Sequence, residues 1–222
     1  MADEDTREFL RGVLLEFNRN QLRAVATNDH HLAIAHADAT TNVNALQHII
    51  VPRDDVSNLT DWLRRMFRKS VNVIVQDNVL CLSLGDAEVR APLVFGSYPN
   101  YRDVVPNHTR SFVVDCSSLL ALLDEACDKS ETATFKVSLS KAALSLSKDS
   151  GHESQLNVDY DGDSIETGLD SIYPGNILRA IQCDRVRIAV KGREHPWRFE
   201  SEQDESATYV LMPVKVWDLG SE

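Results

Sequence analysis

The feature that most constrains the fold is a strand–turn–strand pattern that occurs four times along the chain. In the first copy, residues 13–36, apolar side chains alternate on both sides of the polar turn Asn18-Arg19-Asn20. The later copies span residues 71–84, 135–147 and 186–200, and each follows a segment with apolar residues at helical spacing. A helix followed by a hairpin, repeated with little identity, predicts pseudo-repeated halves inside two α+β domains.

Apolar periodicity also places the helices. We expect a short helical segment at residues 3–11 and longer helices at 53–68, at 117–127 and from Pro174 to about Cys183. Helix 53–68 should bury one apolar stripe, formed by Val56, Leu59, Leu63, Met66 and Phe67. A linker rich in Pro and Gly, residues 95–106, predicts domains at 1–105 and 106–222.

Composition narrows the function classes. The 222 residues carry a net charge of −11, which argues against broad non-specific binding of nucleic acid, although base gathers at residues 64–69. The chain has no apolar run long enough to span a membrane, and its acidic start does not resemble a signal peptide, so we expect a cytoplasmic location. Four scattered cysteines without a Cys-x-x-Cys pair are typical of reduced thiols.

Four motifs, in a fixed order, resemble one known family. They are Leu22-Arg-Ala-Val-Ala-Thr-Asn-Asp-His-His-Leu-Ala, Tyr98-Pro-Asn-Tyr-Arg, a helix start with Tyr173, and Tyr209-Val-Leu-Met-Pro-Val. Together they are similar to motifs of the bacterial DNA polymerase III β sliding clamp. Asp29 stands where the family has Gly, and His31 stands where it has Arg. The resemblance implies the clamp fold, helices packed on antiparallel sheets, and no catalysis, cofactor or metal.

Family chains have three domains, and this sequence aligns from within the first helix of the second. The resemblance therefore implies a chain without the first domain, and a first remaining domain (1–105) without its first strand and most of its first helix. We expect the remaining domain to expose a sheet edge and apolar surface that a neighbouring subunit could cover.

The family forms rings of six similar domains around double-stranded DNA, with helices facing the phosphates. With two domains per chain, a ring requires a cyclic homotrimer with head-to-tail contacts. The resemblance implies that the DNA-facing positions are Arg53, Arg64, Arg65, Arg68, Lys69 and Arg179. A solvated helix face is the alternative interpretation of each of these residues.

Family clamps also bind short linear peptides of polymerases and clamp-loader subunits in an apolar pocket between the last two domains. The matching positions are Leu10, Thr27, His30, Leu32, Pro99, Val104, Tyr173, Val210, Met212 and Pro213. Core packing is the alternative for each residue taken singly. Asp29 adds negative charge and His31 replaces the usual Arg, so partner preference is expected to differ from that of the family.

Two other functions stay open. The chain could be a clamp fragment that forms no ring and competes for clamp-binding peptides or regulates a full-length clamp. Asp29-His30-His31 also matches the signature of Asp-His-His phosphoesterases, which hold manganese, but the upstream acids are only Asp3, Glu4 and Asp5. The acidic stretch Asp159-Tyr-Asp-Gly-Asp163 has its Gly at the wrong position for a calcium loop, which favours a polar turn.

Overall fold

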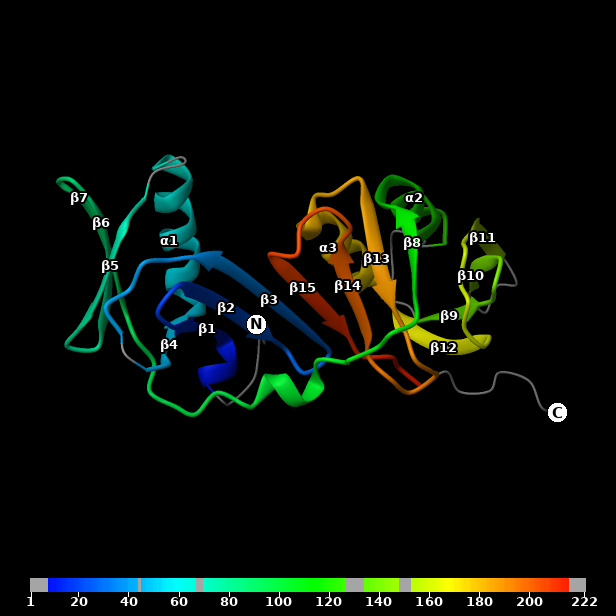
Figure 1. The fold of residues 1–222 in the computed structure, drawn as a ribbon, viewed down its shortest axis with the longest axis horizontal. Coiled ribbons are helices and arrows are strands. Elements are labelled where there is room, and N and C mark those ends of the chain that lie inside the picture. The colour runs from blue at the N-terminus through cyan, green and yellow to red at the C-terminus, as the bar shows by residue number, and fades with distance from the viewer. Residues whose placement is uncertain (1–7, 44, 67–69, 127–133, 148–152, 216–222) are drawn as a thin grey trace. The chain divides into compact units, whose positions relative to one another are not determined.

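The computed structural model describes residues 8–43, 45–66, 70–126, 134–147 and 153–215. Contacts divide the chain into two compact units, residues 1–100 (unit 1) and residues 101–222 (unit 2). Figure 1 shows helices and antiparallel strands in both units. The fold is therefore α+β, as the sequence predicts. None of the helices within the described ranges has the length and apolar character needed to cross a membrane.

Unit 1 contains two antiparallel sheets and one α-helix. The first sheet has the order β4-β1-β2-β3, and the second has the order β5-β6-β7. Helix α1 contacts β1 and β4 of the first sheet and β7 of the second (Figure 1). The elements are η1 (Glu8–Arg11), β1 (Gly12–Phe17), β2 (Gln21–Thr27), β3 (His31–Asp38), β4 (Gln47–Pro52), α1 (Arg53–Arg65), β5 (Asn72–Gln76), β6 (Val79–Leu84) and β7 (Ala87–Pro92).

Unit 2 contains two four-stranded antiparallel groups and two α-helices. The strand orders are β11-β10-β9-β12 and β15-β14-β13-β8, and helices α2 and α3 contact each other as well as strands of both groups. The elements are η2 (Tyr101–Val104), β8 (Ser111–Asp115), α2 (Cys116–Ala126), β9 (Thr134–Leu139), β10 (Ala143–Ser147), β11 (Glu153–Asn157), β12 (Ile165–Asp170), α3 (Ile172–Ile181), β13 (Arg185–Ala189), β14 (Trp197–Ser201) and β15 (Ala207–Leu211).

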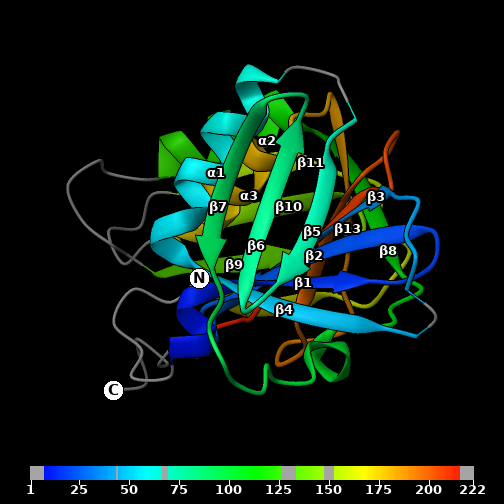
Figure 2. The ribbon, with the colours of Figure 1, turned by 90° about the vertical axis from the view of Figure 1, so that its left-hand side faces the viewer.

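Each half of unit 2 is one strand, one helix and a three-strand meander. The opening strand of each half pairs with the meander of the other half, since β8 lies against β13 and β12 lies against β9. This exchange confirms the predicted pseudo-repeat. Unit 1 shows the same second half, β4-α1-β5-β6-β7, with β4 against β1. Within the described residues, however, β5 pairs with β6 alone, so β5 and β7 are the two edges of their sheet (Figure 2).

Local chemistry sets the start of helix α2. Asp115 Oδ1 accepts a hydrogen bond from the Ser118 backbone N–H at 2.8 Å and another from the Ser117 hydroxyl at 2.6 Å. These bonds satisfy a donor that the first turn leaves without an intrahelical partner. The Ser117 bond, followed by the Ser118 bonds, lowers the pKa of Asp115. Asp115 is therefore the cap of this helix.

The two units differ in how completely their helices are covered. In α3, Ile177 and Leu178 are each only 2% exposed, and they belong to the core around Trp197 and Phe112. In α1, Leu59 is buried, but Leu63 is 43% exposed, so its predicted burial is wrong. The reason is that no second helix packs beside α1 within the described residues, whereas α2 and α3 cover each other. Phe67, also predicted to be buried, lies outside the described residues.

Candidate functional site

The turn between β2 and β3 carries two of the predicted peptide-contact residues, Thr27 and His30. Asn28 Oδ1 accepts backbone hydrogen bonds from His30 at 3.1 Å and from His31 at 3.0 Å. The Thr27 hydroxyl donates to the His31 carbonyl at 2.9 Å. These side chains fold back onto their own backbone, as Asn and Thr do in tight turns. Thr27 is half-buried there, while the side chain of His30 is exposed.

Asp29 holds the strained position of this turn. Its φ is +68°, in the left-handed region that glycine enters freely and other residues enter at a cost. The Asp29 N–H donates to Thr27 Oγ1 at 3.3 Å. Gly, which the resemblance gives at this position, suits the same backbone. The exchange of Gly for Asp therefore keeps the turn and adds an exposed carboxylate to it.

His31 follows this turn and opens strand β3. Burial first, and the neighbouring His30 to a smaller extent, lower the pKa of His31 from 6.5 to about 4. The imidazole is therefore neutral at neutral pH, whereas an Arg at the same position would carry a positive charge. The turn thus presents the Asp29 carboxylate without a compensating charge on residue 31.

The Tyr98-Pro99 segment lies against the core of unit 1. The Tyr98 hydroxyl donates a long hydrogen bond of 3.5 Å to the Val25 carbonyl, and burial raises the pKa of Tyr98 to about 12. Val25 itself is fully buried in strand β2. Tyr98 therefore anchors the chain so that the adjacent Pro99 remains exposed.

The other predicted peptide-contact residues separate by burial. Leu10, Leu32 and Val210 are 0%, 3% and 1% exposed, so their side chains belong to the core of the structure described here. Val104 is 46% exposed, and Tyr173, Met212 and Pro213 are half-buried. Tyr173 lies on α3, which contacts β15, and Met212 directly follows that strand. Unit 2 therefore places several apolar, partly open side chains on adjoining elements.

The predicted DNA-facing arginines do not form a strongly basic surface on the described helices. Arg64, Arg65 and Arg179 are exposed, while Arg53 is half-buried. Arg64 pairs with Asp61 at 3.3 Å, and Arg179 pairs with Asp124 at 3.7 Å. Helices α1, α2 and α3 together hold four arginines against four aspartates and one glutamate, a net charge of −1. The described helix surface is therefore balanced in charge rather than basic. Arg68 and Lys69 lie outside the described residues.

The side chains that suggested a manganese or calcium site do not form a metal-binding group within the described residues. Asp29 and His30 lie in the exposed turn, and no group of three His, Cys, Asp or Glu residues in the described part of the chain could hold a metal ion. Asp163 pairs with Arg110 at 3.1 Å. A Cβ on Gly162 would overlap the Tyr160 hydroxyl oxygen, so this glycine leaves room for the tyrosine.

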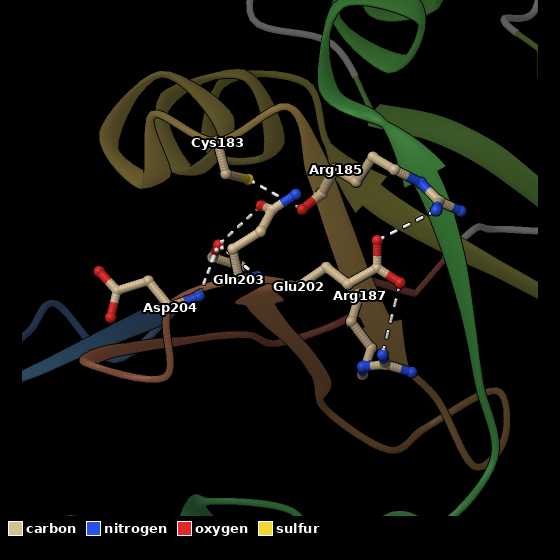
Figure 3. Close-up of polar contacts among 7 residues, drawn as sticks. Cys183, Arg185, Arg187, Glu202, Gln203 and Asp204 are labelled. Carbon is tan, nitrogen blue, oxygen red and sulfur yellow. Dashed lines mark hydrogen bonds and ion pairs between the residues drawn. The ribbon is translucent and has the colours of Figure 1, made fainter.

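Two features of unit 2, an ion-pair cluster and a surface depression, could not be predicted from the sequence. Glu202 pairs with Arg185 at 3.1 Å and with Arg187 at 3.7 Å, so one carboxylate offsets part of the positive charge of these two β13 arginines (Figure 3). A surface depression lies where β8 begins and β13 ends, lined by Asn107, His108, Thr109, Arg110, Val190 and Lys191. Strand pairing brings these residues together from about 80 positions apart, as in the 3.1 Å bond from the Val190 N–H to the Arg110 carbonyl. Burial lowers the pKa of His108 at this depression.

Comparison with known proteins identifies similar chains. Residues 1–100 match the family described as DNA polymerase III beta subunit, central domain. The beta sliding clamps of Vibrio cholerae and Escherichia coli are 29% and 28% identical to this chain, over 97% of its length and 60% of theirs. Among solved structures, a sliding clamp from Pseudomonas aeruginosa gives a TM-score of 0.87 at 25% identity, over 97% of this chain and 61% of that one. A Pseudomonas aeruginosa clamp bound to griselimycin gives the same TM-score and identity. This chain spans about 60% of the length of the curated relatives.

Proposed function

We propose that this chain is a member of the DNA polymerase III beta-subunit family and acts as a sliding-clamp-like processivity factor in DNA replication or repair. In this function it encircles double-stranded DNA in the cytoplasm, catalyses no reaction and tethers polymerases. The observation that carries the proposal is the TM-score of 0.87 to a sliding clamp over 97% of the chain. The likeness thus extends through both units rather than through the matched 1–100 segment alone.

Ring closure follows from the number of units. A ring of six units needs three chains, each contacting the next in the same head-to-tail manner. Strands β7 and β11 are edge strands of the described sheets and end the meanders β5-β6-β7 and β9-β10-β11. Antiparallel pairing of β7 from one chain with β11 of the next would close a cyclic homotrimer. Because the described helices are nearly balanced in charge, the ring would hold DNA by topology more than by affinity.

Tethering requires a site for short peptides of polymerases and clamp-loader subunits. The residues proposed to contact them are the exposed or half-buried members of the predicted set: Thr27, His30, Pro99, Val104, Tyr173, Met212 and Pro213. Leu10, Leu32 and Val210 would support these residues from the core. Apolar side chains that keep part of their surface open suit an aromatic or leucine anchor of an extended peptide.

Retention on DNA tests the encircling function. The chain is incubated with a nicked circular plasmid or with the same plasmid linearised, and bound protein is separated by gel filtration. A ring stays with the circle and slides off the linear form. An Arg64→Glu/Arg65→Glu variant should be retained less than Arg19→Glu, which changes an arginine in the β1–β2 turn. Equal retention on both plasmids would indicate ordinary charge-driven binding, and no retention would refute encirclement.

The charge balance of the helices favours one second function. With Arg64 and Arg179 each paired to an aspartate, the helices in the described part of the chain offer little positive charge to phosphates. The chain could then bind clamp-binding peptides without forming a ring and compete with a full-length clamp. In a polymerase assay driven by a full-length clamp, such a competitor would shorten the DNA products. A processivity factor would lengthen them.

A further inference from the structure

A local excess of positive charge surrounds the surface depression where β8 begins and β13 ends. The segments that form it, residues 106–110 and 190–196, hold three Lys or Arg residues and two histidines against a single acid, Glu194. The whole chain has the opposite balance, with 34 Asp and Glu against 23 Lys and Arg. Positive charge concentrated at one hollow of an acidic protein attracts anions to that hollow. The depression is therefore a candidate site for an anionic ligand.

Hydrogen bonds hold the two segments in place. His108 Nε2 donates to the Pro196 carbonyl at 3.0 Å, which ties the segment before β8 to the β13–β14 loop. The Thr167 hydroxyl donates to the Arg193 carbonyl at 2.7 Å, which ties the same loop to strand β12. A site whose walls are already fixed loses little conformational entropy when a ligand binds. The depression is therefore pre-organised, although two loop segments form it.

The donors around the depression suit a tetrahedral anion. Lys191 and Arg110 are exposed at its wall, the amide of Asn107 and the hydroxyl of Thr109 complete the polar lining, and Val190 is buried beneath them. A phosphate accepts charge-assisted hydrogen bonds from several directions, which matches donors on separate segments. The volume of about 340 Å³ holds about ten waters at roughly 30 Å³ each, enough for such a group. The six described residues that line it include no Phe, Tyr or Trp, so a nucleic-acid base finds no aromatic ring to stack on.

Arg110 takes part in an ion pair that an anion can displace. Its guanidinium lies 3.1 Å from Asp163 Oδ2, and the side chains of Arg110 and Asp163 are 51% and 96% exposed. Ion pairs this open to water contribute little to stability, so exchanging the carboxylate for a doubly charged phosphate requires only a side-chain movement. The pair also shows that the Arg110 guanidinium already accepts an acidic group at this position.

We propose that this depression binds the phosphate group of a small molecule, with Lys191 and Arg110 as its charged contacts and Asn107 and Thr109 as its neutral donors. Inorganic phosphate and a nucleoside monophosphate share the chemistry that such a site recognises. All of its residues belong to unit 2, and none is among those proposed to contact peptides or to face DNA. The inference therefore goes beyond the proposed function and does not depend on it.

Anion binding should be linked to protonation of His108. A carbonyl oxygen only accepts hydrogen bonds, so Nε2 carries the proton of the neutral ring and a second proton enters at Nδ1. Burial lowers the pKa of His108, and the bond with the Pro196 carbonyl offsets this in part. Repulsion from His195, Lys191 and Arg198 lowers the pKa as well. A bound dianion cancels some of this positive charge and should therefore raise the pKa of His108.

Titration with inorganic phosphate, followed by NMR on the full chain, tests the site. At constant pH and ionic strength, with chloride as the balancing salt, the ring signals of His108 and His195 should shift saturably, and that of His48, exposed on β4, should not. Lys191→Glu should weaken binding at least tenfold, with the circular dichroism spectrum unchanged. Lys136→Glu is the matched control, because it makes the same charge change at an exposed lysine on β9. No saturable shift, or an equal loss in both variants, would overturn the proposal.

A comparison of probes identifies the source of the phosphate. Adenosine monophosphate should compete with inorganic phosphate for the shift of His108. If a double-stranded oligonucleotide shifts His108 while both small probes do not, the depression is a DNA contact and the proposal is refuted. Sulfate keeps its double charge between about pH 5 and 8, so replacing chloride with sulfate should raise the pKa of His108 over that range. An unchanged pKa in saturating sulfate would refute contact between the anion and this depression.

The two proposals fail separately. If the chain binds phosphate at Lys191 but is not retained on circular DNA, encirclement fails and the phosphate site stands. If the chain is retained on circular DNA but its histidine signals ignore phosphate, the clamp function stands and this inference fails. Retention on circular DNA by Lys191→Glu should equal that of the wild type, because the site is not needed for encirclement.

Discussion

Oxidation of Cys116 and Cys183 should form a disulfide that links the two helices of unit 2. Cys116 begins α2 and Cys183 lies just beyond α3, and their sulfur atoms are 3.1 Å apart although both thiols are free. Glutathione disulfide would accept two electrons and two protons from the pair and leave a bond between Cys116 and Cys183. Burial, followed by the hydrogen bond with Cys183, raises the pKa of Cys116 to about 12, so the reaction should be slow at neutral pH and faster in alkali.

The expected stabilisation follows from the length of chain that the bond would close. The two cysteines are 67 positions apart. The chain-entropy model gives about 4 kcal/mol for a loop of that length, and native-state strain commonly reduces this to about 2–4 kcal/mol. For a unit of this size, that corresponds to a rise in the melting temperature of roughly 10 °C. The bond would act on the unfolded chain, because the two sulfurs already touch in the folded one.

Intact mass and unfolding measurements check this prediction together. Oxidised protein should be lighter by two hydrogens, yield a Cys116–Cys183 peptide after digestion, and unfold at a higher urea concentration. Cys81→Ser should respond as the wild type does, whereas Cys116→Ser should not respond. A failure to cross-link in alkaline oxidant would show that the sulfurs are not adjacent. A cross-link that leaves stability unchanged would refute the entropic argument.

Three further changes test the local structure. The pKa of His31 is about 4 in the folded protein and about 6.5 in the unfolded chain, so the free energy of unfolding should fall by ~1–2 kcal/mol as the pH drops from 6.5 to 4, after allowing for partial exposure. Urea unfolding measured across this pH range should show no such fall for the His31→Gln variant. Asp29→Val should cost about 1–2 kcal/mol at φ +68°, whereas Asp29→Gly should change thermal stability by less than ~1 kcal/mol. Leu59→Ala should lower the free energy of unfolding of unit 1 by about 2–5 kcal/mol, because this side chain is 7% exposed in its core.

Much of the fold follows from periodicity in the sequence. The hairpins at 71–84 and 135–147 and the burial of Ile177 and Leu178 were predictable, because strand and helix spacing state which side of an element is apolar. The same spacing does not state whether another element covers that side. Leu63 has a core-like position in its helix, yet it is exposed because no second helix lies beside α1 in the described residues.

The candidate sites were predictable only in part. The motifs around Thr27 and Tyr98 have local signatures, and the left-handed position of Asp29 falls where the family has Gly. No local signature in the sequence predicts the Cys116–Cys183 pair or the depression between His108 and Lys191, because strand and helix packing bring together residues that are 67 or more positions apart. The sequence also does not show how much positive charge Arg64 and Arg179 present to a ligand, because this depends on their ion pairs with aspartate in the folded structure.

Binding of griselimycin tests the central claim most directly, because a Pseudomonas aeruginosa clamp with the same fold binds it. Titration calorimetry on the 222-residue chain should show saturable binding with one ligand per chain. Tyr173→Ala and Met212→Asp should each weaken it at least tenfold, and Asn176→Ala, an exposed position on α3, should not. A folded chain that binds no griselimycin, or one whose binding ignores both changes, would contradict the assignment of a clamp-type peptide site.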